Sequence, residues 1–183
     1  MQTELTFNPI EALDPKRHNR RAFTCGVKQL DVLIQKKARK EAPDLSLTFV
    51  LTCKEVPGEI LGFYSLSATK LEAGDLPADM KKKIGQYGCI PATLLGQLAT
   101  STKYQRNKEL RIGETLLIDA MFRTQLAARH VASFGLIVDV LKTETSDPTG
   151  FYRRYGFIEC VETADRMYLP IKTIEAILHE AGL

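Results

Sequence analysis

The sequence predicts an α+β fold built on a mostly antiparallel sheet, and three observations carry that prediction. Two β-rich runs lie on either side of the turn segment PGE at 57–59, as in an antiparallel hairpin. A third run, residues 92–101, has apolar residues at both odd and even positions, which is typical of a central strand that is buried on both faces. From residue 113 onward, helix and strand patterns alternate, and this order implies one parallel strand pair in the middle of the sheet. We expect a single domain over residues 1–183, with helices flanking the sheet.

The first half of the chain reads as one helix, three strands and a shorter helix. Apolar residues at helical spacing predict a helix from Val27 to Glu41, which ends before a proline. Residues 45–53 and 60–68 form the hairpin strands. Residues 70–91 read as loop, short helix and loop, and residues 92–101 form the third strand, which we expect to be buried on both faces.

The second half reads as a basic loop, a long helix, and then strands that alternate with shorter helices. The amphipathic pattern predicts that the long helix begins near Gly113. Asp147 is the predicted N-cap of a short helix, with Pro148 at its first position. The remaining elements are a strand at 131–141, the end of the short helix at Gly156, strands at 157–162 and 166–171, and a helix at 172–183.

Composition excludes several classes of protein. Hydrophobic residues make up 44% of 183 residues, enough for a sizeable core and too many for a disordered chain. No apolar run approaches the roughly 20 residues that span a bilayer, and the first 21 residues are acidic and proline-containing where a secretory signal would be apolar. We therefore predict a soluble, cytoplasmic protein without a membrane segment. Isolated cysteines and histidines predict neither a metal site nor a disulfide framework: Cys25, Cys53, Cys89, Cys160, His18, His130 and His179.

The positive charge is concentrated rather than large. The net charge is +3, but three basic runs lie in the N-terminal half, at 15–21, 36–40 and 81–83. Each run could be an ordinary solvated face. Three together favour a polyanionic partner.

A basic loop that ends in glycine at a helix N-terminus is a candidate anion site. Free backbone N–H groups and the helix dipole both favour phosphate there, and Arg106, Lys108 and Arg111 add charge around Gly113. The preceding strand ends at Leu98 and Ala99, where a strand that parts from its parallel neighbour offers backbone groups to an extended ligand. A ligand with a peptide-like arm and a pyrophosphate, such as coenzyme A, fits both features.

These residues carry a resemblance. The segments LLGQLATSTKYQ, LRIGETLLIDAMFR, IVDV and FYRRYGF resemble, in this order, the GNAT (Gcn5-related) acetyltransferases. With FTCGVKQLDVLIQKKARKE and ILGFYSLSA, the likeness narrows to the GNAT toxins of bacterial toxin–antitoxin modules and extends from about Phe23 to Leu169. The resemblance implies acetyl-CoA as donor, the α-amine of aminoacyl-tRNA as acceptor, a block of translation, a ribbon-helix-helix antitoxin and a homodimer. It places acetyl-CoA on Leu98, Ala99, Thr100, Arg106, Lys108, Arg111, Ile112, Gly113, Glu114 and Thr115.

The chain departs from the family pattern in two places. The family loop reads Arg/Gln-x-x-Gly-x-Gly/Ala, whereas here Lys108 stands in the Arg/Gln place and Arg111 in the first glycine's place. A side chain there either crowds the pyrophosphate or binds it ionically. The toxins often carry arginine where this chain has Gln97.

Acetyl transfer from a thioester to an amine needs a donor for the departing thiolate, and a phenol can supply it. The resemblance places the family's catalytic tyrosine at Tyr152, on the short helix. The alternative is that Tyr152 is a core residue with a locally satisfied hydroxyl. Tyr155 reads as packing. The backbone N–H near Ala99 would polarise the acetyl carbonyl.

Substrate contacts are expected on two kinds of surface. Tyr64 and Ser65 are candidates for the acceptor groove. The alternative, which the sequence supports equally, is that they are ordinary residues of a strand with one face in solvent. Lys36, Lys81 and Lys82 would contact tRNA phosphates without reading bases. Two other functions stay open: an acetyltransferase for a small amine or protein N-terminus, and a non-catalytic module that binds RNA or a protein partner.

Overall fold

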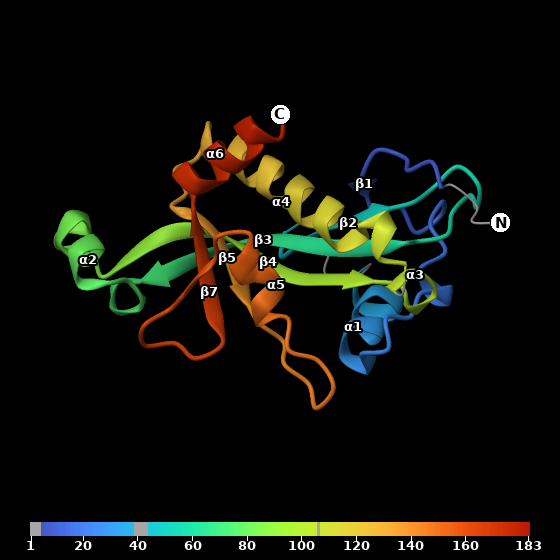
Figure 1. Cartoon of the computed structure of the whole chain (residues 1–183), viewed down its shortest axis with the longest axis horizontal. Coiled ribbons are helices and arrows are strands. Elements are labelled where there is room, and N and C mark those ends of the chain that lie inside the picture. The colour runs from blue at the N-terminus through green and yellow to red at the C-terminus, as the bar shows by residue number, and fades with distance from the viewer. Residues whose placement is uncertain (1–4, 39–43, 106) are drawn as a thin grey trace. The chain divides into compact units, whose positions relative to one another are not determined.

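The computed structural model describes residues 5–38, 44–105 and 107–183 and confirms the α+β class. Within these ranges, seven strands form one sheet in the order β1-β2-β3-β4-β5-β7-β6. All of them except β6 are labelled in Figure 1. Strands β4 and β5 pair in parallel, whereas β1 with β2, β2 with β3, β5 with β7 and β6 with β7 pair antiparallel. The single parallel pair expected from the order of elements is therefore present in the middle of the sheet.

The strands are β1 (Glu11–Ala12), β2 (Leu47–Leu51), β3 (Gly62–Glu72), β4 (Cys89–Thr100), β5 (Gly135–Asp139), β6 (Ile158–Glu159) and β7 (Arg166–Pro170). The α-helices are α1 (Lys28–Val32), α2 (Ala78–Ile84), α3 (Thr102–Gln105), α4 (Ile112–Ala128), α5 (Thr149–Arg154) and α6 (Ile171–Glu180). Short 3₁₀ or π segments are η1 (Arg20–Ala22), η2 (Leu33–Lys37), η3 (Ala73–Asp75) and η4 (Lys108–Leu110).

Contacts group the chain into two compact units, each with its own apolar core. The first unit comprises residues 1–67 and 97–120, and the second comprises residues 68–96 and 121–183. Strands β3 and β4 and helix α4 contribute residues to both.

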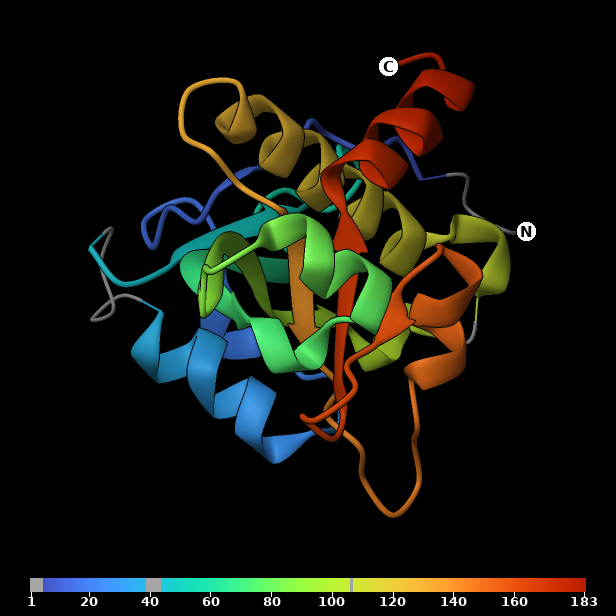
Figure 2. The same cartoon turned by 90° about the vertical axis from the view of Figure 1, so that its left-hand side faces the viewer.

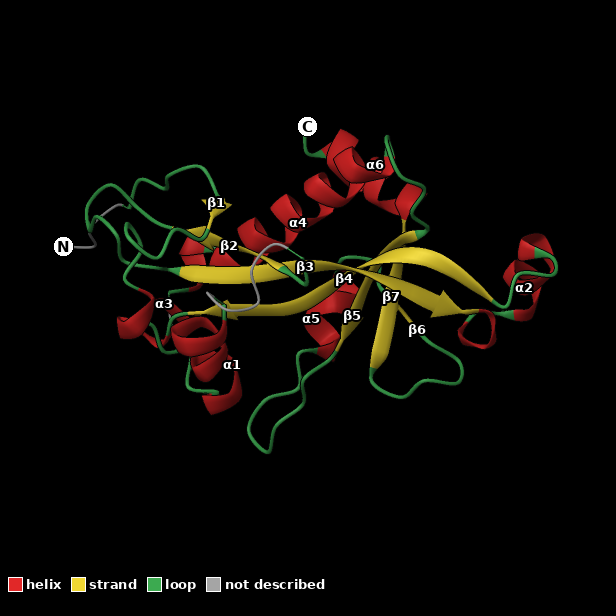
Figure 3. Ribbon diagram, turned by 180° about the vertical axis from the view of Figure 1, so that it is seen from behind, coloured by secondary structure: helices red, strands yellow, loops and turns green. Residues whose placement is uncertain are grey.

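In the first unit, α1 and the first turns of α4 lie on opposite faces of β2 and β3 (Figure 3). Phe63 packs edge-to-face on Phe23 with ring centroids 5.2 Å apart, in a cluster that includes Ile34 of η2. The neighbouring residue, Gly62, faces α4. A Cβ there would come within 2.8 Å of Leu116, so the close approach of α4 requires glycine.

The second unit is built on β5 and β7 and the parts of β3 and β4 that belong to it. Its core cluster includes Leu71, Ala92, Ile137 and Tyr168, and the Tyr168 hydroxyl lies 3.9 Å from the Met80 sulfur of α2. Helix α6 follows β7 directly and packs on β5 and β7 (Figure 2).

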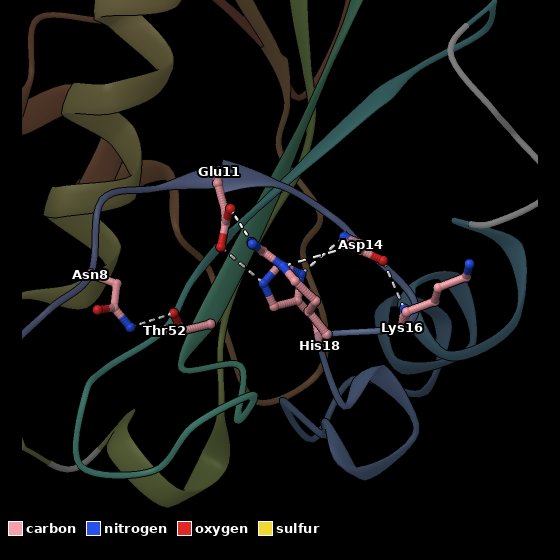
Figure 4. A network of polar contacts seen from close by, with 7 residues as sticks. Asn8, Glu11, Asp14, Lys16, His18 and Thr52 are labelled. Carbon is pink, nitrogen blue, oxygen red and sulfur yellow. Dashed lines mark hydrogen bonds and ion pairs between the residues drawn. The ribbon is translucent and has the colours of Figure 1, made fainter.

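The N-terminal segment lies along the edge of β2, which the sequence did not predict. The Asn8 N–H donates to the Thr52 carbonyl (2.9 Å), and the Asn8 side-chain amide donates to the Thr52 hydroxyl (3.0 Å; Figure 4). Further along, the Leu13 N–H donates to the Thr48 carbonyl (2.9 Å). These bonds satisfy backbone groups of β2 that would otherwise form an open sheet edge.

His18 fixes the turn that follows this segment. Its buried ring accepts the Asp14 N–H at Nδ1 (2.9 Å), and its Nε2 lies 3.2 Å from a Glu11 carboxylate oxygen (Figure 4). Because Nδ1 accepts, the proton of the neutral ring is on Nε2 and donates to Glu11. His18 thus has a structural role in the turn.

Several boundaries differ from the sequence prediction. Strand β3 continues to Glu72 because Lys70 and Glu72 are exposed while Leu71 is buried, which is a strand alternation. Strand β5 begins only at Gly135, since the chain leaves α4 through an exposed turn that contains Val131. The predicted strand at 157–162 shortens to β6. Of the helix expected from Val27 to Glu41, residues 39–41 lie outside the described residues, and the part after Val32 is a π-helix.

Two further predictions were wrong in detail. Strand β4 is central, but it is not buried on both faces, because Gly96 and the polar Gln97 interrupt its apolar surface. The short helix begins at Thr149 with Pro148 as its N-cap, one residue later than predicted. Asp147 still acts at this end, since its carboxylate accepts the Thr149 N–H at 2.9 Å.

Candidate active site

Strand β4 continues well beyond its parallel ladder. The ladder with β5 joins three residue pairs, of which the last is Leu95 with Val138, and β4 ends at Thr100. In this last part of the strand Ala99 is buried, and Leu98 and Thr100 are half-buried. These are the strand residues for which the sequence predicted acetyl-CoA contacts.

The segment after β4 is fixed by hydrogen bonds to other parts of the first unit. The Ser101 N–H donates to the Leu61 carbonyl (2.8 Å), and the Gln105 amide donates to the carbonyl oxygens of Thr100 (2.7 Å) and Cys25 (2.9 Å). Sequence reasoning did not single out Gln105, because its partners lie 5 and 80 residues away.

A second anchor holds α3 to the loop before β3. The Tyr104 hydroxyl donates to Glu59 (2.8 Å), and the Lys103 ammonium lies 2.9 Å from the same carboxylate. Burial alone would raise the pKa of Glu59, but the hydrogen bonds from Lys103 and Tyr104 outweigh it and hold the pKa below its usual value. Glu59 is therefore a stable anion. It fixes α3, which leads into the basic loop at 106–113, called the phosphate loop from here on.

The phosphate loop ends in a left-handed residue. Arg111 has φ 47° and ψ 34°, a conformation that costs a non-glycine residue about 1–2 kcal/mol. It stands in the place where the family pattern has glycine, so the geometry explains that glycine. The preceding turn, η4, is capped by Asn107, whose side chain accepts the Glu109 N–H at 3.1 Å.

Helix α4 presents free N–H groups at its start. The Thr115 N–H donates to the Arg111 carbonyl (3.0 Å), whereas the N–H groups of Ile112, Gly113 and Glu114 have no backbone acceptor among the described residues. Three unpaired N–H groups at the positive end of a 17-residue helix suit a phosphate group. These are residues for which the sequence predicted a contact with the donor's pyrophosphate.

The charged side chains of the loop differ in their partners. The Arg111 guanidinium forms a two-point ion pair with the Glu114 carboxylate, one helical turn away. The Lys108 side chain is exposed and has no ion-pair partner in the described part of the chain. Arg106, also predicted to bind acetyl-CoA, lies outside the described residues.

In the second unit, Tyr152 lies on α5 among aromatic rings. Its ring packs edge-to-face on Phe151 (5.2 Å) and Phe157 (5.4 Å), and the residue is 6% exposed. Burial raises the pKa of Tyr152 to about 12. No hydrogen-bond partner of its hydroxyl is found among the described residues, and the oxygen is not one of their fully buried unpaired atoms. Tyr152 is thus a protonated phenol whose ring is held by packing alone.

Tyr64 lies in the core of the first unit. It is 0% exposed, its ring stacks on Phe49 at 5.2 Å, and its hydroxyl donates to Asp119 of α4. A contact between Tyr64 and substrate would require the side chain to leave this position. Ser65 points to the other face of β3, where its hydroxyl donates to the side-chain oxygen of Gln97. Sequence reasoning did not predict this hydrogen bond between residues 32 positions apart.

Two of the three basic runs meet in the first unit. The Arg20 guanidinium donates to the carbonyl oxygens of Ile34 and Gln35, so the loop at 15–21 is tied to the end of η2, where Lys36 is exposed. Lys81 and Lys82 belong to the second unit, where they are exposed on the last turn of α2.

Other features of the described chain do not resemble a reaction centre. A cavity of about 550 Å³ is lined by the N-terminal segment and the loop before β3, around Arg17 and His18. Within the described ranges, no three His, Cys, Asp or Glu residues are grouped so as to hold a metal ion. None of the helices there is long and apolar enough to cross a membrane.

The chain is similar in sequence to a protein described as a probable toxin. No family model matches it. It is 30% identical over 173 residues to a protein of Sinorhizobium fredii (strain NBRC 101917 / NGR234) described as the probable toxin TacT, and the alignment covers 92% of this chain and 94% of that protein.

Solved structures of two other toxins match along nearly the whole chain. A tyrosine-to-phenylalanine mutant of KacT has a TM-score of 0.81 and 27% identity, covering 94% of this chain and 99% of KacT. AtaT complexed with acetyl-methionyl-tRNAfMet has a TM-score of 0.80 and 28% identity, covering 96% and 99%. A tyrosine-to-phenylalanine mutant of AtaT, bound to the C-terminus of the antitoxin AtaR and to acetyl-CoA, has a TM-score of 0.73 and 25% identity, covering 94% and 98%.

Proposed function

The chain belongs to the GNAT toxins of toxin–antitoxin modules, and we propose that it transfers the acetyl group of acetyl-CoA to the α-amine of aminoacyl-tRNA. The observation that carries this proposal is the likeness to AtaT, which was solved with acetyl-methionyl-tRNAfMet and matches over 96% of this chain. Acetylation removes the nucleophilic amine that an aminoacyl-tRNA needs for peptide-bond formation. The enzyme would therefore block translation.

The reaction does not need a strong general base, but it needs a positioned acid that protonates the leaving sulfur. An α-amine has a pKa of about 7.7–8.0, so part of it is neutral near pH 7 and can attack without a strong base. The nitrogen attacks the thioester carbon, a C–N bond forms, the C–S bond breaks, and the sulfur leaves with the electron pair. The amine loses one proton and the sulfur gains one, so charge and atoms balance.

Tyr152 is the proposed proton donor to the sulfur. Because burial raises its pKa to about 12, the phenol keeps its proton throughout the physiological range. Packing on Phe151 and Phe157 holds the ring in one orientation, and the hydroxyl has no local partner to give up. The solved KacT and AtaT mutants replace a tyrosine by phenylalanine, which removes the same chemical group.

The donor's pyrophosphate is assigned to the start of α4. The three unpaired N–H groups of Ile112, Gly113 and Glu114 fit phosphate oxygens, and Lys108, Arg111 and the Thr115 hydroxyl complete the proposed set. Leu98, Ala99 and Thr100 would line the extended arm of the donor. In this assignment the Ala99 N–H polarises the acetyl carbonyl.

The acceptor's phosphates are assigned to the basic surfaces. Lys36 and the loop at 15–21, which Arg20 ties together, would position the tRNA backbone, as would Lys81 and Lys82 of α2. Ser65 stays a candidate for the acceptor itself, through its hydrogen bond to Gln97.

Partners and location follow from the same family. The likeness to AtaT bound to AtaR supports an antitoxin partner, and we propose that it is of the ribbon-helix-helix type. We further propose that the chain is one domain, forms a homodimer and works in the cytoplasm. Co-expression with a ribbon-helix-helix antitoxin gene, if one lies beside the gene of this chain, followed by light scattering of the complex and of the chain alone, tests the partner and the dimer.

One experiment decides the function. The purified protein is incubated with acetyl-CoA and either charged tRNA, free amino acids or short peptides, and mass spectrometry then identifies the acetylated product. We expect acetyl groups on the α-amine of charged tRNA and an unreacted Tyr152→Phe sample. Acetylated free amino acids or peptides with unmodified tRNA would assign the chain to another acceptor.

A further inference from the structure

The loop before α4 and the first turn of α4 have a small positive charge. The sequence there has three positive side chains, Arg106, Lys108 and Arg111, and two negative ones, Glu109 and Glu114, so the net charge is only +1. Charge-assisted hydrogen bonds from arginine to phosphate are strong ones. A guanidinium that is held by a carboxylate contributes such bonds only after that ion pair opens.

The Arg111–Glu114 ion pair engages one of these three positive side chains. Both ends of the guanidinium fork contact the Glu114 carboxylate, while the Arg111 side chain stays 67% exposed. Glu114 belongs to the first turn of α4, where a carboxylate is stabilised by the same helix dipole that favours phosphate. A diphosphate at the unpaired N–H groups would lie close to this carboxylate and be repelled by it.

Arg111 is placed to exchange one anion for another. Its guanidinium presents a planar set of donors that matches carboxylate and phosphate oxygens equally well. Its backbone is already in the left-handed conformation, so only the side chain has to turn. Because the Arg111 side chain is 67% exposed, water and salt screen its pair with Glu114 and lower the cost of the exchange.

We propose that Arg111 and Glu114 form a latch that sets the affinity of this enzyme for acetyl-CoA. Without the donor, Glu114 holds the guanidinium. With the donor, the Arg111 side chain turns to the diphosphate and binds it, at a position where the family pattern has glycine and therefore no side chain. The affinity for acetyl-CoA is then the outcome of a competition between the diphosphate and Glu114. This inference rests on the proposed function, since it presupposes that the donor's diphosphate lies at α4.

The test is acetyl-CoA binding by titration calorimetry, with no turnover involved. Arg111→Gly removes the guanidinium and suits the backbone φ of 47°, so this variant should fold at least as well as the wild type while binding acetyl-CoA about tenfold more weakly. Glu114→Gln frees Arg111 and should bind acetyl-CoA about threefold more tightly. Glu72→Gln, which breaks the exposed pair of Lys70 with Glu72 (2.8 Å) in the second unit, is the matched control and should bind as the wild type does.

A second ligand separates the two phosphate groups of the donor. The affinity of Arg111→Gly, relative to that of the wild type, should be reduced by the same factor for 3′-dephospho-acetyl-CoA as for acetyl-CoA. A loss that disappears with the dephosphorylated ligand would place Arg111 on the 3′-phosphate and overturn the assignment to the diphosphate.

Two other results would also overturn the latch, and they are distinguishable from failure of the function. Unchanged binding by Arg111→Gly would show that its guanidinium never meets the donor. Weaker binding by Glu114→Gln would show that the pair supports the helix start instead. In both cases wild-type binding leaves the proposed function standing, whereas a wild type that does not bind acetyl-CoA removes both.

Discussion

The Gln105 amide joins the end of β4 to the segment before α1, because it donates to the carbonyl oxygens of both Thr100 (2.7 Å) and Cys25 (2.9 Å). Thr100 belongs to the strand proposed to hold the extended arm of acetyl-CoA. The phosphate loop begins immediately after Gln105. One side chain therefore fixes both the strand end and the start of the loop.

Gln105→Ala should loosen this end of the site. We expect the free energy of unfolding to fall by about 1–2 kcal/mol, since two hydrogen bonds to carbonyls are lost. The KM for acetyl-CoA should rise severalfold, with kcat nearly unchanged because no reacting group is touched. Steady-state kinetics and urea unfolding measure both effects. Gln105→Glu, which keeps the size but cannot donate, should behave alike, and an unchanged KM in both variants would contradict the positioning role.

Tyr152→Phe should abolish most turnover without unfolding the protein. The ring contacts with Phe151 and Phe157 remain, and only the hydroxyl is lost. A positioned general acid contributes about 10²–10⁴-fold, so kcat should fall by that range while binding of acetyl-CoA persists. Tyr155→Phe, at the C-cap of the same helix, is the matched control and should keep its turnover. Equal kcat values for both variants would remove Tyr152 from the chemistry.

The raised pKa of Tyr152 predicts a specific alkaline instability. Burial raises the pKa from about 10 in the unfolded chain to about 12 in the folded one. The folded state then holds the proton more tightly, so this contribution to stability is complete below pH 10 and is lost as the pH rises toward 12.

Denaturant unfolding of the wild type and Tyr152→Phe between pH 9 and 12 measures the loss. The unfolding free energy of the wild type should fall relative to that of Tyr152→Phe by up to about 2–3 kcal/mol over this range. Other tyrosines with raised pKa values, Tyr104 and Tyr168, are present in both proteins and cancel. A difference that does not vary with pH would mean that Tyr152 is not buried as described.

The basic surface predicts steep salt dependence of tRNA binding. Lys36 and Lys37 end η2 beside the loop that Arg20 anchors. If each lysine neutralises one phosphate, the slope of log K against log salt should fall by about one for each alanine substitution. Filter binding of charged tRNA at several salt concentrations measures this slope. Lys172→Ala, in the first turn of α6, is the control, and a slope unaffected by Lys36→Ala and Lys37→Ala would exclude this surface.

The sequence was sufficient to predict the class of fold because its signals are local. The order of strand, basic loop, helix and strand implied the parallel pair that β4 and β5 form. The i, i+3 spacing of Arg111 and Glu114 is also local and is compatible with an ion pair. The left-handed backbone of Arg111 could not be read from the sequence, because an arginine gives no signal for a positive φ.

The features that sequence reasoning missed depend on partners far apart in the chain. Strand β1 has two residues, and its pairing with Phe49 and Val50 arises only once the hairpin exists. Ser65 and Gln97 are linked across strands, and neither residue type indicates its partner. Tyr64 was predicted to face either the acceptor groove or solvent, because the alternation of side chains along a strand does not show which face α4 covers.

Tyr64→Phe distinguishes a core residue from a substrate contact. The stack on Phe49 survives the substitution, while the hydrogen bond to Asp119 is lost from a fully buried site. Because hydrogen bonds to charged groups contribute about 1.5–3 kcal/mol, we expect the unfolding free energy to fall by about that amount. The kcat/KM for charged tRNA, measured well below the melting temperature, should be unchanged. Ser65→Ala on the opposite face is the comparison: it removes a buried hydrogen bond to Gln97, so stability should fall by about 0.5–1.5 kcal/mol, and the KM for charged tRNA should rise. The reverse pattern, with turnover lost in Tyr64→Phe and kept in Ser65→Ala, would return Tyr64 to the acceptor site.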